Sequence, residues 1–369
     1  MRTTGLLSVH VVVPDDIDDV AVPSGGNAYD RRVCLGLADN GCSVHELAVA
    51  GGWPRPDAAA RESLARTLAT LPDGAVVLVD GLVACGVPDV VVPRAQRLKL
   101  VVLVHLPLGD EVGASPSAAA ELAALERETL HAASAVVATS SWVARRLVAT
   151  HGLPAERIHV ATPGADPAPL AAGTDRASRL LCVGSVTPTK GQDLLVEALA
   201  TVHSAAADLP WSCDLTGPLS RDPGHVASVR SMIERHGLGE RVRLTGPKTG
   251  ERLEAAYAEA DLLVLPSRVE AYGMVVTEAL ARGIPVVAAA VGGVPRSLGV
   301  DPDGRVPGIL VPPADVEALA GALRRWLGDS ELRDRLRGSA RRRRDTLDGW
   351  GVTSRCLAEV LEPLSGTPA

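Results

Sequence analysis

Aromatic residues are scarce in this chain of 369 residues: Phe is absent, and Trp and Tyr make up 2% of the sequence. Proteins that bind single-stranded nucleic acid commonly stack bases on aromatic side chains, so this composition argues against that function class. The net charge of −7 likewise provides no general attraction for a phosphate backbone. We therefore expect no nucleic-acid partner.

The cysteines are isolated in the sequence, with no C-x-x-C pair and no histidine at metal-ligand spacing. There are six of them: Cys34, Cys42, Cys85, Cys182, Cys213 and Cys356. Isolated thiols of this kind are typical of small buried hydrophobes in a reducing compartment. They predict neither a disulfide framework nor a metal site.

Long apolar runs are also lacking. The longest, 98–108, contains Lys99 and His105 and is far shorter than the roughly 20 residues that a membrane span needs. The N-terminus has one arginine and then continues into a strand pattern, so we expect no signal peptide. These features predict a cytoplasmic protein.

Short β-branched runs alternate with helical patterns along the chain, which favours parallel sheets with helices on both faces. We expect strands at 6–13, 43–49, 75–80, 100–105, 135–139, 179–183, 213–216, 242–244, 261–265 and 285–289. We expect helices at 27–40, 118–133, 192–202, 315–327 and 331–344, among others.

A segment rich in Pro, Gly and Ala, 163–175, interrupts this pattern and is interpreted as a domain linker. Two domains also suit the length, because a single hydrophobic core seldom supports so many residues. The predicted fold class is therefore α/β, with two tandem doubly wound, Rossmann-like domains.

Four consecutive arginines, 341–344, end one of the expected helices. Such a run is usually a solvated helix face and less often a patch for anionic lipid. The second interpretation would give a peripheral contact with the inner face of the membrane.

The most informative segment runs from Ser267 to Pro295 and holds two carboxylates, Glu270 and Glu278, eight residues apart. It follows an expected strand, and a helical pattern opens after Gly273. Ligands of open parallel sheets bind at the carboxyl ends of strands, so we expect both carboxylates there, with sugar hydroxyls as suitable partners. A hydrolytic acid and base is an alternative, but the spacing does not guarantee that the two groups face each other, and separate roles are preferred.

A loop from Gly184 to Gly191 connects the expected strand 179–183 to the expected helix 192–202. Free N–H groups at a helix N-terminus, together with Lys190, suit a diphosphate. The loop is not a Walker A motif, because Lys190 precedes the glycine and no Ser or Thr follows. A purely structural turn is the alternative.

The first half of the chain offers two further signals. Gly25 and Gly26 lie between a strand and a helix, where paired glycines allow a ligand close to the backbone, although a turn capped by Ser24 or Asn27 is equally consistent. His105 ends an expected strand, where catalytic groups gather, although a single histidine is more often structural. The chain has no G-x-G-x-x-G motif, which counts against an oxidoreductase.

Together these motifs resemble the family 4 retaining glycosyltransferases of the GT-B fold. The resemblance covers nearly the whole chain, and its specific part is the pair Glu270 and Glu278 within the pattern P-S-x-x-E-x-x-G-x-x-x-x-E-A. It implies transfer of a sugar, with retention, from a UDP- or GDP-sugar to an acceptor that the sequence does not identify: a glycan, a lipid or a small molecule. It also implies that no metal or other cofactor is needed.

The resemblance further implies an organisation into three parts. An acceptor-binding domain spans 1–170, a nucleotide-sugar donor domain spans 171–345, and a C-terminal helix in 346–369 crosses back to the first domain.

The resemblance also implies residue roles. Glu270 lies beside the donor sugar, Lys190 stabilises the leaving diphosphate, and His105 approaches the sugar from the first domain. Glu278 accepts hydrogen bonds from the ribose. The remaining donor-binding residues are Gly25, Gly26, Gly184, Ser185, Ala271, Tyr272, Gly273 and Met274.

One position departs from the family pattern. Many relatives carry Arg where this chain has Ser185, so the positive charge on the diphosphate rests on Lys190, the helix N-terminus and Arg268. Two D-x-D spacings, Asp16 to Asp18 and Asp301 to Asp303, are interpreted as solvated turns. A sugar-nucleotide epimerase and a non-catalytic sugar-nucleotide-binding protein stay open as alternatives.

Overall fold

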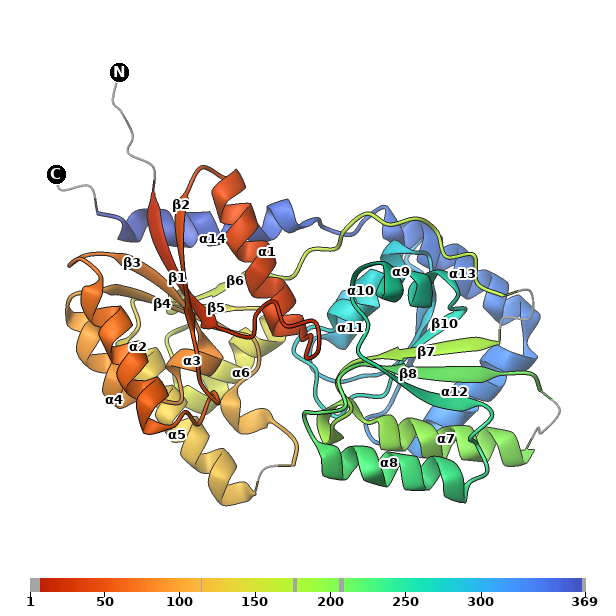
Figure 1. Cartoon of the computed structure of the whole chain (residues 1–369). Helices are drawn as coiled ribbons and strands as arrows, with labels where there is room; N and C mark the ends of the chain where they lie inside the picture. The colour runs from red at the N-terminus through yellow and green to blue at the C-terminus, as the bar shows by residue number, and fades with distance from the viewer. Residues whose placement is uncertain (1–6, 114, 175–177, 206–208, 367–369) are drawn as a thin grey trace. The chain divides into compact units, whose positions relative to one another are not determined.

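The computed structural model of the chain describes residues 7–113, 115–174, 178–205 and 209–366 (Figure 1). They form two compact units. The first unit takes in the chain up to Asp18, residues 25–164 and the chain from Gly349 onwards. The second unit takes in residues 19–24 and 165–348.

The first unit is built on a six-stranded parallel sheet with the order β2-β1-β3-β4-β5-β6. Its strands are β1 (Ser8–Pro14), β2 (Ser43–Val49), β3 (Val76–Asp80), β4 (Lys99–Val104), β5 (Ala135–Ala138) and β6 (Ile158–Val160). Its α-helices are α1 (Gly25–Asp39), α2 (Ala58–Thr70), α3 (Gly81–Ala84), α4 (Pro88–Val91), α5 (Pro116–Ala132), α6 (Ser141–His151) and α14 (Trp350–Leu361). Every residue of the central strand β3 is buried, which explains its apolar run of four residues before Asp80.

The second unit holds another six-stranded parallel sheet, with the order β12-β11-β10-β7-β8-β9. Its strands are β7 (Arg179–Val183), β8 (Ser212–Thr216), β9 (Val242–Gly246), β10 (Leu262–Leu265), β11 (Val286–Ala289) and β12 (Gly308–Val311). Its α-helices are α7 (Gln192–Ala205), α8 (Pro223–Arg235), α9 (Gly250–Ala258), α10 (Met274–Ala281), α11 (Val294–Leu298), α12 (Val316–Gly328) and α13 (Ser330–Arg344).

Alternate residues of these strands enter two separate cores. Leu262 and Val264 belong to a cluster that includes the buried Trp326, whereas Leu263 and Leu265 belong to a cluster that includes Tyr257. Because successive side chains of a strand point to opposite faces, the two clusters line the two faces of the sheet. The prediction of two doubly wound α/β domains is confirmed.

The strand order places a switch point in each sheet. β7 opens the second unit and pairs with β8 on one side and with β10 on the other. Connections leave the carboxyl ends of these strands in opposite directions, so a crevice forms there in this class of fold. The loops after β7 and β10 are the ones that carry Lys190 and Glu270.

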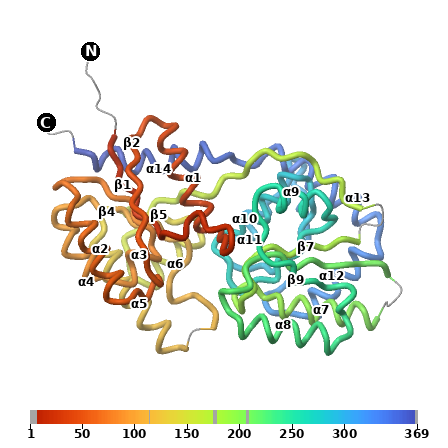
Figure 2. The backbone as a smooth tube through the Cα atoms, in the orientation of Figure 1, coloured from red at the N-terminus to blue at the C-terminus, as the bar shows by residue number. Residues whose placement is uncertain are grey.

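The last helix, α14, belongs to the first unit, and it lies beside α1 in both the cartoon and the tube view (Figures 1 and 2). The rings of Tyr29 and Trp350 meet edge to face with their centroids 5.7 Å apart. Thr353 Oγ1 also donates to the carbonyl of Thr162 at 2.7 Å. The final helix is therefore fastened to the first unit by both apolar and polar contacts.

The arginine run at the end of α13 is not a solvated face. Arg342 forms an ion pair of 2.6 Å with Asp301, whose side chain is fully buried. Arg343 and Arg344 donate to the carbonyls of Leu298 and Ala168. The interpretation of Asp301 as a solvated turn residue was therefore wrong, and three of the four arginines make internal contacts.

None of the described helices is long and apolar enough to cross a membrane. The six thiols are free, and four of them, Cys34, Cys85, Cys182 and Cys213, are buried as expected of small hydrophobes.

Candidate active site

Lys190 and Glu270, 80 positions apart in the sequence, form an ion pair in the second unit. Lys190 Nζ lies 2.7 Å from Glu270 Oε2, and the same oxygen accepts a hydrogen bond from Ser267 Oγ at 3.2 Å. The lysine side chain is 31% exposed and the glutamate side chain 11% exposed, so the pair is partly open to solvent. The structure thus brings together two residues that the sequence offered only as separate motifs.

Two glycines of the loop after β7, Gly184 and Gly191, have backbone conformations that favour glycine. Gly184 has a φ of 152°, and a Cβ on it would lie 3.5 Å from Lys190 Cγ, so the lysine stem packs over this glycine. Gly191 has a φ of 69°, and a Cβ there would lie 2.3 Å from the carbonyl oxygen of Pro266. Gly191 thus allows the loop after β7 to pack closely against the loop after β10, whereas Gly184 lies under the side chain of Lys190.

A second glycine pair supports Glu270 from behind. A Cβ on Gly292 would lie 1.7 Å from the carbonyl oxygen of Glu270, and one on Gly293 would lie 2.3 Å from that of Ala271. Gly293 N donates to the Glu270 carbonyl at 3.0 Å. The main chain from Glu270 onwards is therefore fixed by close backbone contacts.

The donor-binding candidates Ala271, Tyr272, Gly273 and Met274 form the turn that enters α10. Gly273 precedes the helix with a φ of 87°, a conformation that favours glycine. The first N–H groups of a helix lack partners within the helix and suit a polar ligand. The geometry is consistent with main-chain recognition of a donor by this turn.

Glu278 lies on α10 and has a different partner from Glu270. Tyr257 donates its hydroxyl to Glu278 Oε2 at 2.6 Å, and Arg282 donates to the Glu278 carbonyl at 2.7 Å. Burial raises the pKa of Glu278, while the hydrogen bond from Tyr257 and the charge of Arg282 oppose that rise. Separate partners for the two carboxylates favour separate roles over a hydrolytic acid and base pair.

Tyr257 was missed as a site residue in the sequence. The only available signal was its chemistry, because it is one of three tyrosines in an aromatic-poor chain. Its phenol is buried, and burial and the charge of Glu278 raise its pKa. It therefore serves as a neutral hydrogen-bond donor to Glu278.

Arg268 is held in an ion pair with Asp193. Its guanidinium donates to both carboxylate oxygens of Asp193, at 2.8 and 2.6 Å, and to the carbonyl of Pro188 at 2.8 Å. Ser185 contributes its carbonyl, which accepts a hydrogen bond from Gln192 Nε2 at 3.0 Å. The expectation that Arg268 adds positive charge at the diphosphate stays a prediction, because Arg268, like Lys190, is paired with a carboxylate in this structure.

His105, in the first unit, sits among buried carboxylates. Its Nε2 lies 2.8 Å from Asp30 Oδ1, and Asp80 lies beside Asp30. Burial lowers the pKa of His105, but the charge and hydrogen bond of Asp30 outweigh burial and raise it to about 9. Burial and the charge of Asp30 raise the pKa of Asp80 to about 8.

The ring of His105 also packs on the predicted glycine pair. A Cβ on Gly26 would lie 3.4 Å from His105 Cδ2, and the ring of Tyr29 meets that of His105 edge to face at 5.2 Å. Gly25 is the first residue of α1. The first-unit motifs Gly26 and His105 are thus in contact, whereas Asp30 and Asp80 were missed because neither belongs to a recognisable motif.

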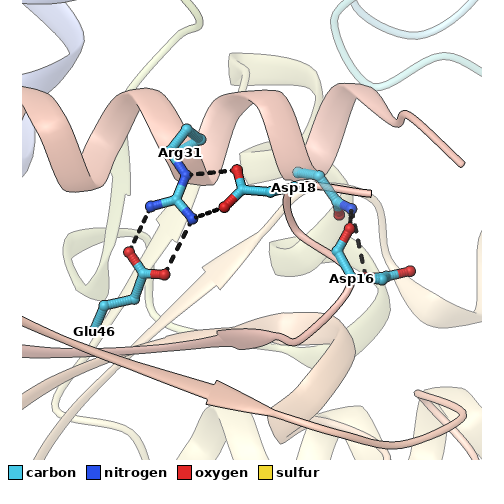
Figure 3. Close-up of polar contacts among 5 residues, drawn as sticks. Asp16, Asp18, Arg31 and Glu46 are labelled. Carbon is cyan, nitrogen blue, oxygen red and sulfur yellow. Dashed lines mark hydrogen bonds and ion pairs between the residues drawn. The ribbon is translucent and has the colours of Figure 1, made fainter. Parts of the chain in front are cut away.

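The loop between β1 and α1 is held by a polar network (Figure 3). Arg31 forms ion pairs with Asp18 at 2.5 Å and with Glu46 at 2.6 Å. Asn27 Nδ2 donates to the carbonyl of Asp16 at 3.0 Å. The carboxylate of Asp18 is therefore occupied by an arginine.

Asp30, Asp80 and His105 also carry ligand atoms that could coordinate a cation. Among the described residues they are the one such group, with ligand atoms within 4.8 Å of one another. His105 Nε2, however, is already hydrogen-bonded to Asp30. This contact links the imidazole and the carboxylate through a shared hydrogen bond.

Two family models match the chain. Residues 173–343 match the model described as "Glycosyl transferases group 1", and residues 5–164 match the model described as "Glycosyl transferase 4-like domain". The two matches fall in different halves of the chain. The first contains Lys190, Glu270 and Glu278, and the second contains Gly26 and His105.

Curated relatives include two named as D-inositol 3-phosphate glycosyltransferases. The one from Jonesia denitrificans is 31% identical over 254 residues, which cover 64% of this chain and 58% of the relative. The one from Catenulispora acidiphila is 32% identical over 267 residues, covering 68% and 62%. The matched part thus spans less than two thirds of the length of these relatives.

Solved structures share the fold at low sequence identity. Sucrose-phosphate synthase from Thermosynechococcus elongatus matches with a TM-score of 0.76 and 22% identity, covering 97% of this chain and 99% of that one. Anabaena HepE in complex with UDP-glucose matches with a TM-score of 0.73 and 18% identity, covering 97% and 100%. These likenesses support the predicted GT-B fold class.

Proposed function

The chain belongs to the group 1 glycosyl transferases, and we therefore propose that it transfers a sugar from a nucleotide-diphosphate sugar to an acceptor hydroxyl. The observation that carries this proposal is the pairing of Lys190 with Glu270 at the switch point of the second sheet, with Glu278 on the helix that follows. This arrangement offers a cation for the diphosphate and carboxylates for the sugar and ribose hydroxyls.

In the proposed complex, the Lys190 ammonium leaves Glu270 for the diphosphate and stabilises the charge that develops as the diphosphate departs. Glu270 then becomes free to accept hydrogen bonds from the donor sugar, assisted by the main chain of 271–274. Glu278, oriented by Tyr257, accepts hydrogen bonds from the ribose. Gly184 and Ser185 line the same loop as Lys190.

We propose that His105 contributes a positively charged imidazole beside the reacting sugar, since Asp30 keeps it protonated at neutral pH. Gly25 and Gly26 would allow the donor close to the main chain next to this ring. We further propose that transfer proceeds with retention and without a metal ion.

A UDP-sugar is the donor that we propose first, because solved structures of the same fold are complexes with UDP or UDP-glucose. D-inositol 3-phosphate is the acceptor to test first, because it is named in several relatives.

The test is to incubate the chain with UDP-glucose, and in parallel with GDP-glucose, with and without D-inositol 3-phosphate and with and without EDTA. A transferase releases nucleoside diphosphate faster when an acceptor is present, and NMR of the product then reports the anomeric configuration. Conversion of the donor sugar without an acceptor would favour the epimerase. Binding of the nucleotide with no turnover across a panel of inositol, glycan and lipid acceptors would favour a binding protein.

A further inference from the structure

The segment Pro266-Ser267-Arg268 contacts the turn that carries Lys190 at several points. Arg268 N donates to the carbonyl of Thr189 at 2.8 Å, and the Arg268 guanidinium donates to the carbonyl of Pro188 at 2.8 Å. These two carbonyls belong to the residues immediately before Lys190. One residue thus holds the turn through both its main chain and its side chain.

The other side of the turn is held as well. Gly191 packs on the carbonyl of Pro266 so closely that a Cβ would lie 2.3 Å from that oxygen. Ser267, between Pro266 and Arg268, donates its hydroxyl to Glu270. A single tripeptide therefore positions both members of the Lys190 and Glu270 pair.

Asp193 fixes the orientation of the Arg268 guanidinium group. Both carboxylate oxygens accept from the guanidinium, and the two side chains are only 25% and 23% exposed, so solvent screens this pair less than a surface pair. Asp193 also lies in the first turn of α7, where a carboxylate is favoured by the helix dipole. His225 Nε2 adds a further group 3.8 Å from Asp193 Oδ1.

We propose that Arg268 and Asp193 are positioning residues that hold the 188–190 turn so that Lys190 is placed for the donor diphosphate. This inference rests on the proposed function, because it assigns a purpose to the Lys190 turn. The competing role for Arg268 is direct: it would leave Asp193 when the donor arrives and bind a phosphate oxygen itself.

The two roles predict opposite signs for Asp193→Asn. Loss of the carboxylate charge loosens the clamp, which is the Asp193–Arg268 pair together with its hold on the 188–190 turn. This loosening should weaken nucleotide binding if Arg268 positions Lys190. The same loss frees the guanidinium, which should strengthen binding if Arg268 contacts phosphate. Arg268→Lys should be intermediate, because an ammonium cannot reproduce the bidentate fork.

The experiment measures the affinity of the full chain for UDP, and for GDP in parallel, by titration calorimetry. The variants are Asp193→Asn, Arg268→Gln, Arg268→Lys, Lys190→Ala and the double variant Arg268→Gln/Lys190→Ala. Arg342→Gln serves as the matched control, because it breaks another half-buried arginine–aspartate pair of the same unit, with Asp301. Melting temperatures report whether each variant folds.

We expect Asp193→Asn and Arg268→Gln each to weaken binding about tenfold. In the Lys190→Ala background, Arg268→Gln should weaken binding by less than about twofold more, since the effects of coupled residues are not additive. Arg342→Gln should lower the melting temperature without changing affinity. Tighter binding by Asp193→Asn, additive losses in the double variant, or unchanged affinity in Arg268→Gln would each overturn the clamp. A wild-type chain that binds neither UDP nor GDP would overturn the proposed function itself, together with the clamp's role in it.

Discussion

Asp30 Oδ1 lies 2.8 Å from His105 Nε2, and this contact sets the charge of an imidazole that burial alone would keep neutral. Asp30 is 2% exposed, and His105 adds a partly open side chain, 22% exposed, at the surface of the same cluster. The first unit therefore presents a cation that is supported from behind by a buried carboxylate. A second carboxylate, Asp80, completes the cluster and is itself held in its neutral form at pH 7, because its pKa is raised to about 8.

Asp30→Asn should lower the pKa of His105 from about 9, because the charge and hydrogen bond of Asp30 are the main influences that oppose burial, and only the weaker influence of Asp80 remains. The measurement is an NMR titration of the imidazole Cε1–H resonances between pH 5 and 10. A His105 pKa that stays near 9 in the variant would show that Asp30 does not control its charge.

Asp80→Asn should make the stability of the protein less sensitive to pH. The folded-state pKa of Asp80, about 8, lies above the unfolded value of 3.8, so its contribution is fully present below pH 3.8 and is lost as pH rises towards 8. The asparagine mimics the protonated acid and can still cap α3 by accepting from Leu82 N, as Asp80 does at 2.6 Å. The difference in melting temperature, variant minus wild type, should increase by at least about 2 °C from pH 5 to pH 6.5.

The outcome for Asp80→Asn has a clear control. His105 loses its own contribution as pH rises from 6.5 to 9, and Asp80 also raises the pKa of His105, so the comparison is made between pH 5 and pH 6.5, where the His105 contribution is still present in wild type. A difference in melting temperature that is constant across the pH range would mean that Asp80 titrates as an ordinary exposed carboxyl.

Periodicity was sufficient to predict both parallel sheets, since the apolar runs expected at 75–80, 100–105, 179–183 and 261–265 coincide with the central strands β3, β4, β7 and β10. It missed β6 and β12, which have three and four residues and partly exposed side chains, so their patterns carry little signal. The motif-bearing residues Lys190, Glu270, Glu278, Gly26 and His105 were all found in the sequence.

Their supporting residues could not be found in the same way. Asp30, Asp80, Tyr257 and Asp193 act through contacts across 21 to 75 positions of sequence, and only the packed fold brings such partners together. The arginine run shows the same limit, because the buried partner of Arg342, Asp301, lies 41 positions away and in an unremarkable loop. Charge patterns predict exposure only when no buried partner exists.

Gly292→Ala should destabilise the loop behind Glu270 by about 2–4 kcal/mol, since a Cβ would lie 1.7 Å from the Glu270 carbonyl oxygen and the φ of 54° disfavours alanine. We expect a lower melting temperature and loss of UDP binding in the fraction that folds. Gly321→Ala is the matched control: no atom lies within 4 Å of the added methyl group, and the residue is inside α12. That control should stabilise the protein by up to about 1 kcal/mol, as alanine favours helix over glycine. Equal melting temperatures for both variants would contradict the close contact at Gly292.

Tyr257→Phe should move the acid limit of nucleotide binding to higher pH. Glu278 must be ionised to accept hydrogen bonds from both ribose hydroxyls, so the affinity for UDP should fall as the pH is lowered. Because burial raises the pKa of Glu278, this fall should begin at a higher pH than it would for an ordinary glutamate. The hydrogen bond from Tyr257 opposes that rise, and its removal therefore leaves Glu278 protonated over a wider pH range. The check is calorimetric affinity for UDP at several pH values between 4.5 and 8 for wild type, Tyr257→Phe and Glu278→Gln. The glutamine variant should bind weakly at every pH and show little of this dependence; a full pH dependence in Glu278→Gln would assign the titration to another group and remove Glu278 from the ribose.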